Sequence, residues 1–284
     1  MGSAVSRAPT TRRNRAGRVS AVPVLITGAE TAEGRATARR FLRGGGEVRV
    51  FVDPAADRAA EDFRTAGCKI ALGTLDDEGH LETAAEQVHT VVHVGGGPMT
   101  APTQVLDDTA TVLSAAIGAG CRRLIWVSHV GAGDPRGNGY LQACAETEAM
   151  LADAPLESII VRRALTYGPG DPLTLALSAG ALPRDAEEST HQPLYVDDLA
   201  LVLARADHVR GSVGDLSIEV TLTGPTEVLL SGFADLLAAP NRDRDAVPPL
   251  PRTVADLLAR DLVIDDAMVG PTDIPQGLER LTWE

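Results

Sequence analysis

Lysine and aromatic residues are scarce in this 284-residue chain. Lys69 is its single lysine, and aromatic residues make up 3% of the sequence. Hydrophobic residues still account for 44%, which is enough for a sizeable core and excludes global disorder. That core must come from Ala, Val, Leu and Ile, which suits the tightly packed layers of an α/β protein.

Cysteine and long apolar runs are also sparse. The three cysteines, Cys68, Cys121 and Cys144, include no C-x-x-C pair, which argues against a disulfide framework or a zinc cluster. They predict reduced thiols in a cytoplasmic protein. No apolar run reaches the roughly 18 residues of a membrane span, and the first residues lack the apolar stretch of a secretory signal. We therefore expect no membrane partner.

Net positive charge occurs only at the start of the chain. Residues 1–20 hold five arginines and no acid, whereas the whole chain has a formal net charge of −13. The acidic remainder repels phosphate backbones, which argues against nucleic acid as the main partner. We interpret residues 1–20 as a disordered basic tail.

Several catalytic motifs are absent as well. The chain contains no G-x-x-x-x-G-K-[ST] segment, which excludes a P-loop nucleotide hydrolase. It also has neither the G-x-S-x-G turn of an α/β-hydrolase nor the H-E-x-x-H helix of a zinc protease.

What is present is a regular alternation of short β-rich runs and amphipathic segments. Strands are expected at Val22–Thr27, Glu47–Val52, Cys68–Leu72, Val88–Val94, Arg122–Ser128 and Glu157–Arg162. Helices are expected between them, at Ala32–Arg43, Ala55–Ala66, Glu78–Gln87, Pro102–Ala119 and Tyr140–Asp153. This order predicts an α/β fold, a Rossmann-type doubly wound parallel sheet over residues 21–164. In residues 165–284 the alternation is less regular, and we expect them to form a smaller C-terminal substrate and cap region that packs over the sheet edge and does not fold independently.

The first strand leads into a glycine-containing turn, TGAETAEGR. Gly28 permits a tight turn, and Gly34 lets the next helix pack closely on the strand. The helix N-terminus then offers main-chain amides and a positive dipole end to a diphosphate. Thr31 occupies the middle glycine position, where its Cβ crowds the approach to phosphate. The predicted dinucleotide contacts of this turn are Gly28, Ala29, Thr31, Ala32 and Gly34.

Asp53 ends the second predicted strand. A carboxylate there can accept both ribose hydroxyls of NAD and repel the additional phosphate of NADP. An alternative is that Asp53 caps a helix, since Pro54 follows it. Arg35 or Arg58 is available to hold a 2′-phosphate, so NAD is the expected cofactor and NADP the alternative.

Several segments in this order resemble the extended and atypical short-chain dehydrogenase/reductase superfamily, especially its NmrA-like branch. They are VLITGAETAEGR, VHTVVHVGGG, RRLIWVSHVGA, VRRALTYGPGD and PLYVDDLA. The resemblance implies that Leu75 flanks the adenine and that Val94, Gly95 and Gly96 line the pyrophosphate and ribose path. It also allows a homodimer through the helices at 102–119 and 140–153.

The same resemblance implies a catalytic Ser or Thr, a Tyr, and a Lys four residues after the Tyr. Tyr140 stands at the tyrosine position, but Cys144 stands where the lysine belongs. A thiol is neutral at pH 7 and cannot lower the tyrosine pKa as an ammonium does. The serine position falls on Ser128 or, after a one-residue shift, on His129. His129 is either a general acid/base or a surface residue at a strand end.

Other polar residues are expected to have structural roles. We interpret His93 as a core histidine, since His89 is about 13 Å away along a strand and too far to share a metal ion. Glu148 is expected in an ionic contact, and Asp197 and Asp198 are expected to cap a helix.

The sequence identifies no substrate and leaves two functions open. One is a weak or unusual NAD(P)-dependent oxidoreductase or epimerase-like enzyme with an altered active site that acts on an unknown small molecule. The other is a non-catalytic NAD(P)-binding redox sensor or regulatory module, as the missing lysine suggests.

Overall fold

The computed structural model describes residues 23–209, 217–238 and 250–281. The main sheet contains β1 (Val24–Thr27), β2 (Val48–Val52), β3 (Lys69–Leu72), β4 (Thr90–His93), β5 (Arg123–His129), β6 (Glu157–Arg163), β10 (Ser217–Thr223) and β12 (Met268–Val269). The helices beside it are α1 (Ala32–Arg43), α2 (Asp57–Ala66), α3 (Glu78–Ala85), α4 (Pro102–Gly118), α5 (Gly139–Ala152) and α7 (Val196–Ala206).

These eight strands are all parallel and lie in the order β12-β10-β6-β5-β4-β1-β2-β3. The chain order reverses between β1 and β4, and in open α/β sheets dinucleotides bind at the carboxyl ends of the strands at such a switch point. Strands β4 and β5 are buried along their whole length, as expected where helices cover both faces of a parallel sheet. The predicted Rossmann-type sheet is confirmed.

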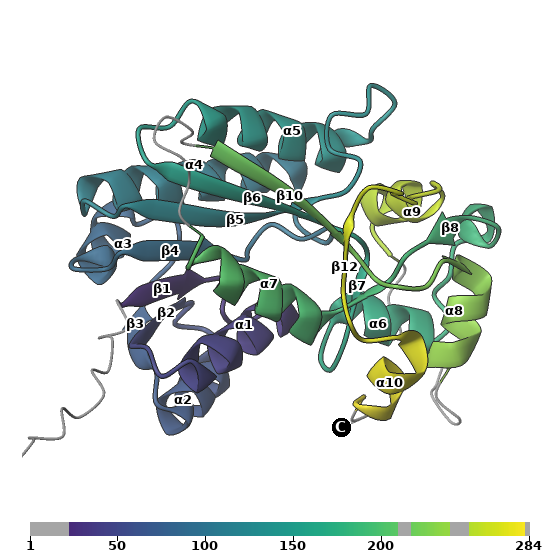
Figure 1. Cartoon of the computed structure of the whole chain (residues 1–284), viewed down its shortest axis with the longest axis horizontal. Helices are drawn as coiled ribbons and strands as arrows, with labels where there is room; N and C mark the ends of the chain where they lie inside the picture. Colours follow the sequence, from purple (N-terminus) through teal and green to yellow (C-terminus); the bar gives the residue numbers. More distant parts are fainter. Residues whose placement is uncertain (1–22, 210–216, 239–249, 282–284) are drawn as a thin grey trace, which may run out of the picture.

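Helices form a layer on each face of the sheet. Figure 1 shows α4 and α5 on one side and α1, α2 and α7 on the other. The long helix α4 packs against both α3 and α5, and α1 packs against α7. Small residues allow this close packing, since Ala32 and Ala36 of α1 form a buried cluster with Val196 and Ala200 of α7.

The remaining elements gather beyond the carboxyl ends of the strands (Figure 1). They are β7 (Thr166–Tyr167), α6 (Pro172–Ser178), a 3-10 turn (Arg184–Ala186), β8 (Thr190–His191), β9 (Leu194–Tyr195), β11 (Val228–Leu229), α8 (Leu230–Leu237), α9 (Arg252–Leu258) and α10 (Ile274–Glu279). They enclose a second apolar core around Tyr167 and Phe233. Residues 165–284 therefore contribute to two parts of the molecule, because α7, β10 and β12 belong to the main layers.

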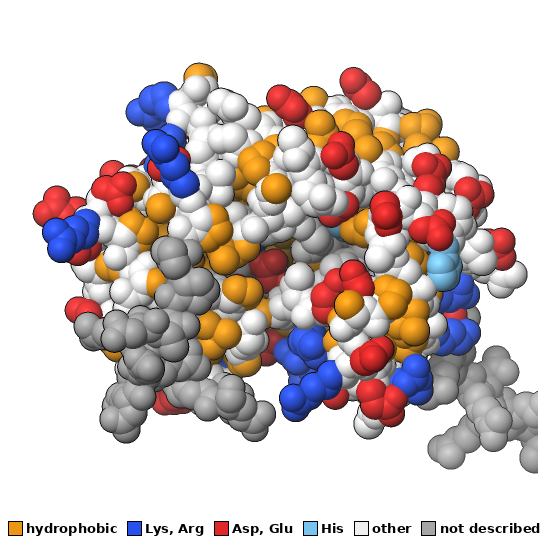
Figure 2. All heavy atoms as spheres, turned by 180° about the vertical axis from the view of Figure 1, so that it is seen from behind, with side chains coloured by type: hydrophobic (Ala, Val, Ile, Leu, Met, Phe, Trp, Pro, Cys, Tyr) orange, Lys and Arg blue, Asp and Glu red, His pale blue; other side chains and the backbone are white. Residues whose placement is uncertain are grey.

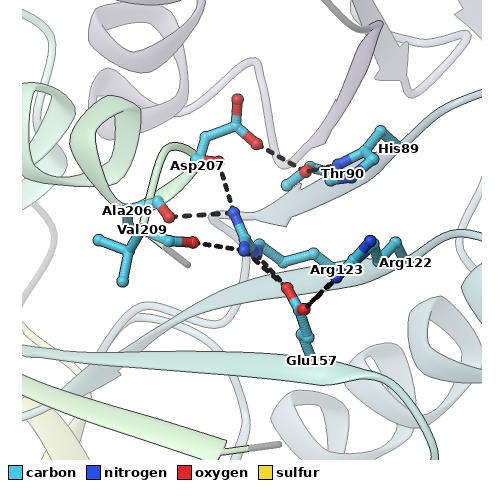
Figure 3. A network of polar contacts seen from close by, with 8 residues as sticks. All are labelled: His89, Thr90, Arg122, Arg123, Glu157, Ala206, Asp207 and Val209. Atoms are coloured by element: carbon cyan, nitrogen blue, oxygen red, sulfur yellow. Dashed lines mark hydrogen bonds and ion pairs between the residues drawn. The ribbon is translucent and has the colours of Figure 1, made fainter. Parts of the chain in front are cut away.

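The amino ends of the strands are fastened by a buried arginine. Arg123, the first residue of β5, forms an ion pair with Glu157 of β6, with Nη2 2.6 Å from Oε2. The same guanidinium donates to main-chain carbonyls at the end of α7, as Figure 3 shows. Asp207 also accepts a hydrogen bond from Thr90 of β4, at 2.6 Å. This network ties α7 to the sheet.

Several general expectations concern the rest of the chain. Among the described residues, no helix has the length and apolarity needed to cross a membrane. All three cysteines are free and buried. Acidic side chains are spread widely over the face seen in Figure 2, whereas basic ones occur in fewer places. The predicted tail at 1–20 lies outside the described residues.

Candidate cofactor and active site

The turn after β1 brings two glycines against neighbouring backbone. Gly28 has a φ of +69°, and a Cβ on it would lie 2.6 Å from the main-chain nitrogen of Gly95. A Cβ on Gly34 would lie 2.2 Å from the carbonyl oxygen of Gly28. Both positions therefore require glycine. The turn packs directly on the loop that follows β4, which places Gly28 and Gly95 side by side at the switch point.

Thr31 is the N-cap of α1. It occupies the position of the middle glycine in the dinucleotide-binding pattern. Its hydroxyl accepts from the amide of Gly34 at 3.0 Å and donates to the carbonyl of Gly28 at 2.8 Å. The side chain thereby fixes the turn and satisfies one of the first amides of the helix. The first-turn amides of Ala32 and Glu33 still point out of the helix N-terminus, where an anion is favoured.

The other predicted cofactor residues lie around this turn. Val94 is buried at the end of β4, Gly95 and Gly96 are partly exposed beside Gly28, and Leu75 packs partly buried against the core. Gly95 and Gly96 therefore adjoin the glycine turn, while Leu75 extends the same edge of the sheet. These placements agree with a dinucleotide that crosses the carboxyl ends of β1 and β4.

Asp53 is exposed just beyond β2. One carboxylate oxygen accepts from the amide of Ala55 at 2.7 Å, so Asp53 stabilises a turn. It is not the N-cap of α2, which is Ala56 and has no side-chain acceptor. The neighbouring side chain of Glu30 is half-buried, and burial together with the Asp53 charge raises the pKa of Glu30. Two acidic groups thus lie near the position expected for the adenosine ribose.

Arg35 is directed to protein partners. Its Nε donates to the carbonyl of Glu30 at 3.2 Å, and its Nη1 lies 3.4 Å from Asp62 of α2. The guanidinium also lies over the ring of Phe63. These contacts compete with the predicted alternative in which Arg35 holds a 2′-phosphate.

Tyr140 and Cys144 lie in successive turns of α5 and are both buried. Their hydroxyl and thiol groups interact, and burial raises the pKa of Cys144 to about 11. The thiol is therefore neutral and cannot supply the charge of the missing lysine. Burial and the nearby thiol also raise the pKa of Tyr140 well above its ordinary value. Tyr140 is consequently a protonated phenol at neutral pH.

Ser128 is held by an ionic cluster between β5 and α5. Its hydroxyl donates to Glu148 Oε1 at 2.6 Å, and the same oxygen accepts from Arg162 Nε at 2.8 Å. Glu148 is buried and pairs with Arg162 of β6. The predicted ionic contact of Glu148 is thus present, and it occupies the hydroxyl group that the resemblance assigned to catalysis.

His129 ends β5 and is fully buried, so the alternative of a surface histidine is wrong. Its Nδ1 lies 2.7 Å from the carbonyl oxygen of Val130, and its ring packs edge-on against Tyr140 with centroids 5.8 Å apart. Burial and the charge of Arg163 lower the pKa of His129 to about 3. A neutral ring of this kind orients Tyr140, but it is a poor proton acceptor at neutral pH.

Sequence reasoning missed the pair Glu33 and Arg163. Glu33 belongs to the first turn of α1 and Arg163 is the last residue of β6, yet both are buried. Glu33 Oε1 lies 3.0 Å from Arg163 Nε and accepts a hydrogen bond from Thr166 at 2.6 Å. The available signal was an arginine at the end of an apolar strand and an acid next to Gly34, but their pairing depends on tertiary structure.

Two further predictions have clear outcomes. His93 is a buried core histidine whose Nδ1 lies 2.7 Å from the hydroxyl oxygen of Thr27. The expected capping by Asp197 and Asp198 is wrong, because α7 follows Tyr195 with no side-chain cap. Asp198 instead accepts from both the amide and the hydroxyl of Thr272, each at 2.8 Å. The described residues contain no cluster of His, Cys, Asp and Glu that could hold a metal ion.

The topological switch point, the two obligatory glycines and the helix N-terminus are the features of a dinucleotide-binding Rossmann protein. The family model described as NAD(P)H-binding matches residues 28–206, so the chain belongs to the NAD(P)H-binding family. The motifs of the sequence resemble the extended short-chain dehydrogenase/reductase superfamily, and the solved structures to which the chain is similar share its fold. NAD or NADP is its cofactor.

Known proteins provide two kinds of comparison. Over 189 residues the chain is 28% identical to the ceramide reductase of Caulobacter vibrioides, a match that covers 63% of this chain and 59% of that relative. The chain therefore spans less than two thirds of that relative's length. Among solved structures, triphenylmethane reductase of a Citrobacter species with NADP(H) has a TM-score of 0.70 and 16% identity, over 90% of this chain and 99% of that one. UDP-glucose 4-epimerase of Thermus thermophilus with NAD has a TM-score of 0.69 and 18% identity, over 91% and 97%.

The residues present fit a pyridine dinucleotide at its diphosphate and adenosine parts. A side chain at Gly28 or Gly34 would collide with neighbouring backbone, so these glycines keep the turn compact beside the first amides of α1, which can hold a diphosphate. Four residues after Tyr140, where the resemblance implies a lysine, the chain has Cys144. Arg163 supplies a buried positive charge.

Proposed function

We propose that the protein is an NAD(P)H-dependent reductase of the short-chain type, with Tyr140 as the proton donor. The observation that carries this proposal is the position of the Tyr140 phenol. It is buried and packs edge-on against the ring of His129, the last residue of β5. The cross-strand partner of His129 is Arg163, so Tyr140 lies near the carboxyl ends of β5 and β6.

The direction of the reaction follows from protonation. A reduced nicotinamide supplies a hydride to a carbonyl carbon, and the carbonyl oxygen then needs a proton. Tyr140 carries such a proton at neutral pH, although its raised pKa makes it a weaker acid than an ordinary phenol. The same raised pKa disfavours the phenolate that would be needed to take a proton from an alcohol. We therefore propose the reductive direction, in which Tyr140 begins the reaction protonated.

The relatives support a reductase in different degrees. The curated relative is a ceramide reductase, and one structural neighbour is a triphenylmethane reductase, whereas other neighbours are epimerases. We propose a carbonyl-containing small molecule as substrate, NAD as the preferred cofactor because of Glu30 and Asp53, and a cytoplasmic location. A homodimer through α4 and α5 remains part of this proposal.

A non-catalytic NAD(P)-binding regulator is the second candidate. Two observations favour it: Cys144 replaces the lysine, and the hydroxyl of Ser128 is bound to Glu148. Such a protein would bind the dinucleotide but transfer no hydride.

Calorimetric titration with NAD, NADH, NADP and NADPH, followed by absorbance at 340 nm with a panel of aldehydes and ketones, separates the two candidates. The reductase proposal expects oxidation of the reduced cofactor by the wild type and a loss of at least tenfold in Tyr140→Phe. Tyr195→Phe is the matched control, since Tyr195 is a buried tyrosine of the cap. Tight cofactor binding with no turnover across the panel would favour the regulator.

A further inference from the structure

Arg163, the last residue of β6, is a buried cation near the proposed proton donor Tyr140. In the superfamily that the sequence resembles, the cation near this tyrosine is a lysine on the same helix, at the position of Cys144. The side chain of Arg163 is 3% exposed, and its cross-strand partner in β5 is His129, whose ring packs edge-on against Tyr140 with centroids 5.8 Å apart. The charge of Arg163 also acts on Tyr140. Position 144 itself carries a neutral thiol. The active site thus keeps a positive charge near the phenol although α5 has lost it.

The guanidinium of Arg163 has unused hydrogen-bonding capacity. Its Nη1 donates to the carbonyl of Ala164 at 3.3 Å. Its Nε is 3.0 Å from Glu33 but lacks the alignment of a hydrogen bond. Its Nη2 lies 3.7 Å from the position that a Cβ on Gly97 would occupy, directly after the glycines of the cofactor path. An arginine has five N–H donors, and the two on Nη2 make no hydrogen bond to the described residues and lie beside Gly97.

Glu33 holds this cation in place. It comes from the glycine turn itself and receives a second hydrogen bond from Thr166 at 2.6 Å, so the carboxylate is fixed from two elements. A buried charge pair is costly to desolvate and is weak evidence for stability alone. Its position between the dinucleotide turn and Tyr140 gives it another use.

We propose that Arg163 is the positioning cation of this active site, held by Glu33 so that its charge stabilises the Tyr140 oxygen when that hydroxyl gives its proton to the substrate oxygen. In this step the Tyr140 O–H bond breaks and a new O–H bond forms on the substrate as its carbonyl carbon receives the hydride. The phenolate then regains a proton from water. This inference rests on the proposed reductase function.

Several titratable or charged groups face this centre, and they determine how it responds to pH. Tyr140 and Cys144 come from α5, His129 from β5, and Glu33 from α1. Asp171, at the start of α6, also acts on Arg163. Arg163 favours the ionised phenol, whereas Glu33 and Cys144 oppose it. Removing Arg163 and removing Glu33 should therefore shift Tyr140 in opposite directions.

The test is a titration of Tyr140 that requires no substrate. A difluorotyrosine at position 140, which ionises at lower pH than tyrosine, is followed by fluorine NMR in the full chain with and without NADH. We expect Arg163→Met to raise the ionisation pH by at least one unit, Arg163→Lys to restore most of the shift, and Glu33→Gln to lower it. Arg162→Met is the matched control, because that neighbouring arginine pairs with Glu148 instead.

An unchanged titration in Arg163→Met would overturn the proposal, and so would equal shifts in Arg163→Met and Arg162→Met. If Arg163→Met does not fold, Glu33→Gln still decides, because it keeps the cation and predicts a shift of the opposite sign. Shifts as expected without any hydride transfer would support the role of Arg163 and refute the reductase function, so the two failures are distinguishable.

Discussion

Two arginines are buried near opposite ends of neighbouring strands, and they are held very differently. Arg123 at the amino end of β5 donates five hydrogen bonds within the described residues, two of them to Glu157 and three to carbonyl oxygens at the end of α7 (Figure 3). Arg163 at the carboxyl end of β6 donates one hydrogen bond and shares one ion pair.

This difference distinguishes a buried arginine that only supports the fold from one whose guanidinium still has N–H donors available. All donors of Arg123 are used by the fold, so no ligand can compete for them. Arg163 is equally buried but keeps donors free beside the glycines of the cofactor path. In parallel α/β sheets ligands bind at the carboxyl ends of the strands. The incompletely bonded arginine is the one at that end.

The largest expected effect is on stability, from Arg123→Met. The substitution removes the buried partner of Glu157 and the donor to the carbonyls of Asp207 and Val209, so we expect the free energy of unfolding to fall by about 3–5 kcal/mol. Urea unfolding measures it. Arg122→Met is the control, because Arg122 is an exposed partner of the same Glu157 and should matter by about 0.5 kcal/mol at most. The affinity of the folded protein for NADH should stay unchanged, and a loss there would contradict the structural role of Arg123.

A second expected effect is a loss of folding stability at acid pH, which depends on His129 near Arg163. Burial and the charge of Arg163 lower the pKa of His129 to about 3 from an ordinary value of 6.5. The unfolded chain then binds a proton that the folded chain does not, so stability present above pH 6.5 is lost as pH falls towards 3. The slope is about 1.4 kcal/mol per pH unit, or about 2 kcal/mol at pH 5.

Thermal unfolding between pH 4 and 8 checks this effect. His129→Gln should flatten the dependence, whereas the exposed His208→Gln should not. His93, whose pKa is lowered to about 4, adds to the slope, and Asp171, whose pKa is raised to about 6, opposes it. The difference between variants is therefore the readout. Equal slopes in His129→Gln and wild type would show that the histidine is not neutral in the folded protein.

A smaller effect is expected at the adenosine end, where another buried polar atom lacks a partner. Glu30 Oε2 has no hydrogen bond, and the Asp53 charge acts on this carboxyl group. Glu30→Gln should improve NADPH affinity about tenfold, or about 1.4 kcal/mol, and change NADH affinity little. Calorimetry measures both affinities, with the exposed Glu61→Gln on α2 as control. Unchanged discrimination in Glu30→Gln would leave Asp53 as the remaining candidate for cofactor choice.

The fold could be predicted from the sequence, but the pairing of the buried charged side chains could not. The alternation of apolar runs and amphipathic helices predicted β1–β6 and α1–α5 to within a few residues, because period and turn chemistry are local signals. Gly28 and Gly34 were predicted for the same reason. The pairing of Glu33 with Arg163 depends on the packing of α1 against the end of β6, which residue spacing does not encode. The bond from Ser128 to Glu148 was missed for the same physical reason.

The smallest expected effect is the change in stability when both members of the Glu33–Arg163 pair are replaced. It distinguishes Arg163 from Arg123. Arg163→Met alone leaves Glu33 buried without its cation and should cost about 3 kcal/mol. Glu33→Leu combined with Arg163→Met removes the whole pair, and the double variant should lie within about 1 kcal/mol of the wild type in urea unfolding, since apolar residues often replace a buried pair without loss. The matching double variant, Arg123→Met with Glu157→Leu, should stay destabilised, because the carbonyls of Asp207 and Val209 remain without their donor. If both pairs recovered equally, the two arginines would be equivalent supports of the fold, and spare donors would not mark the functional one.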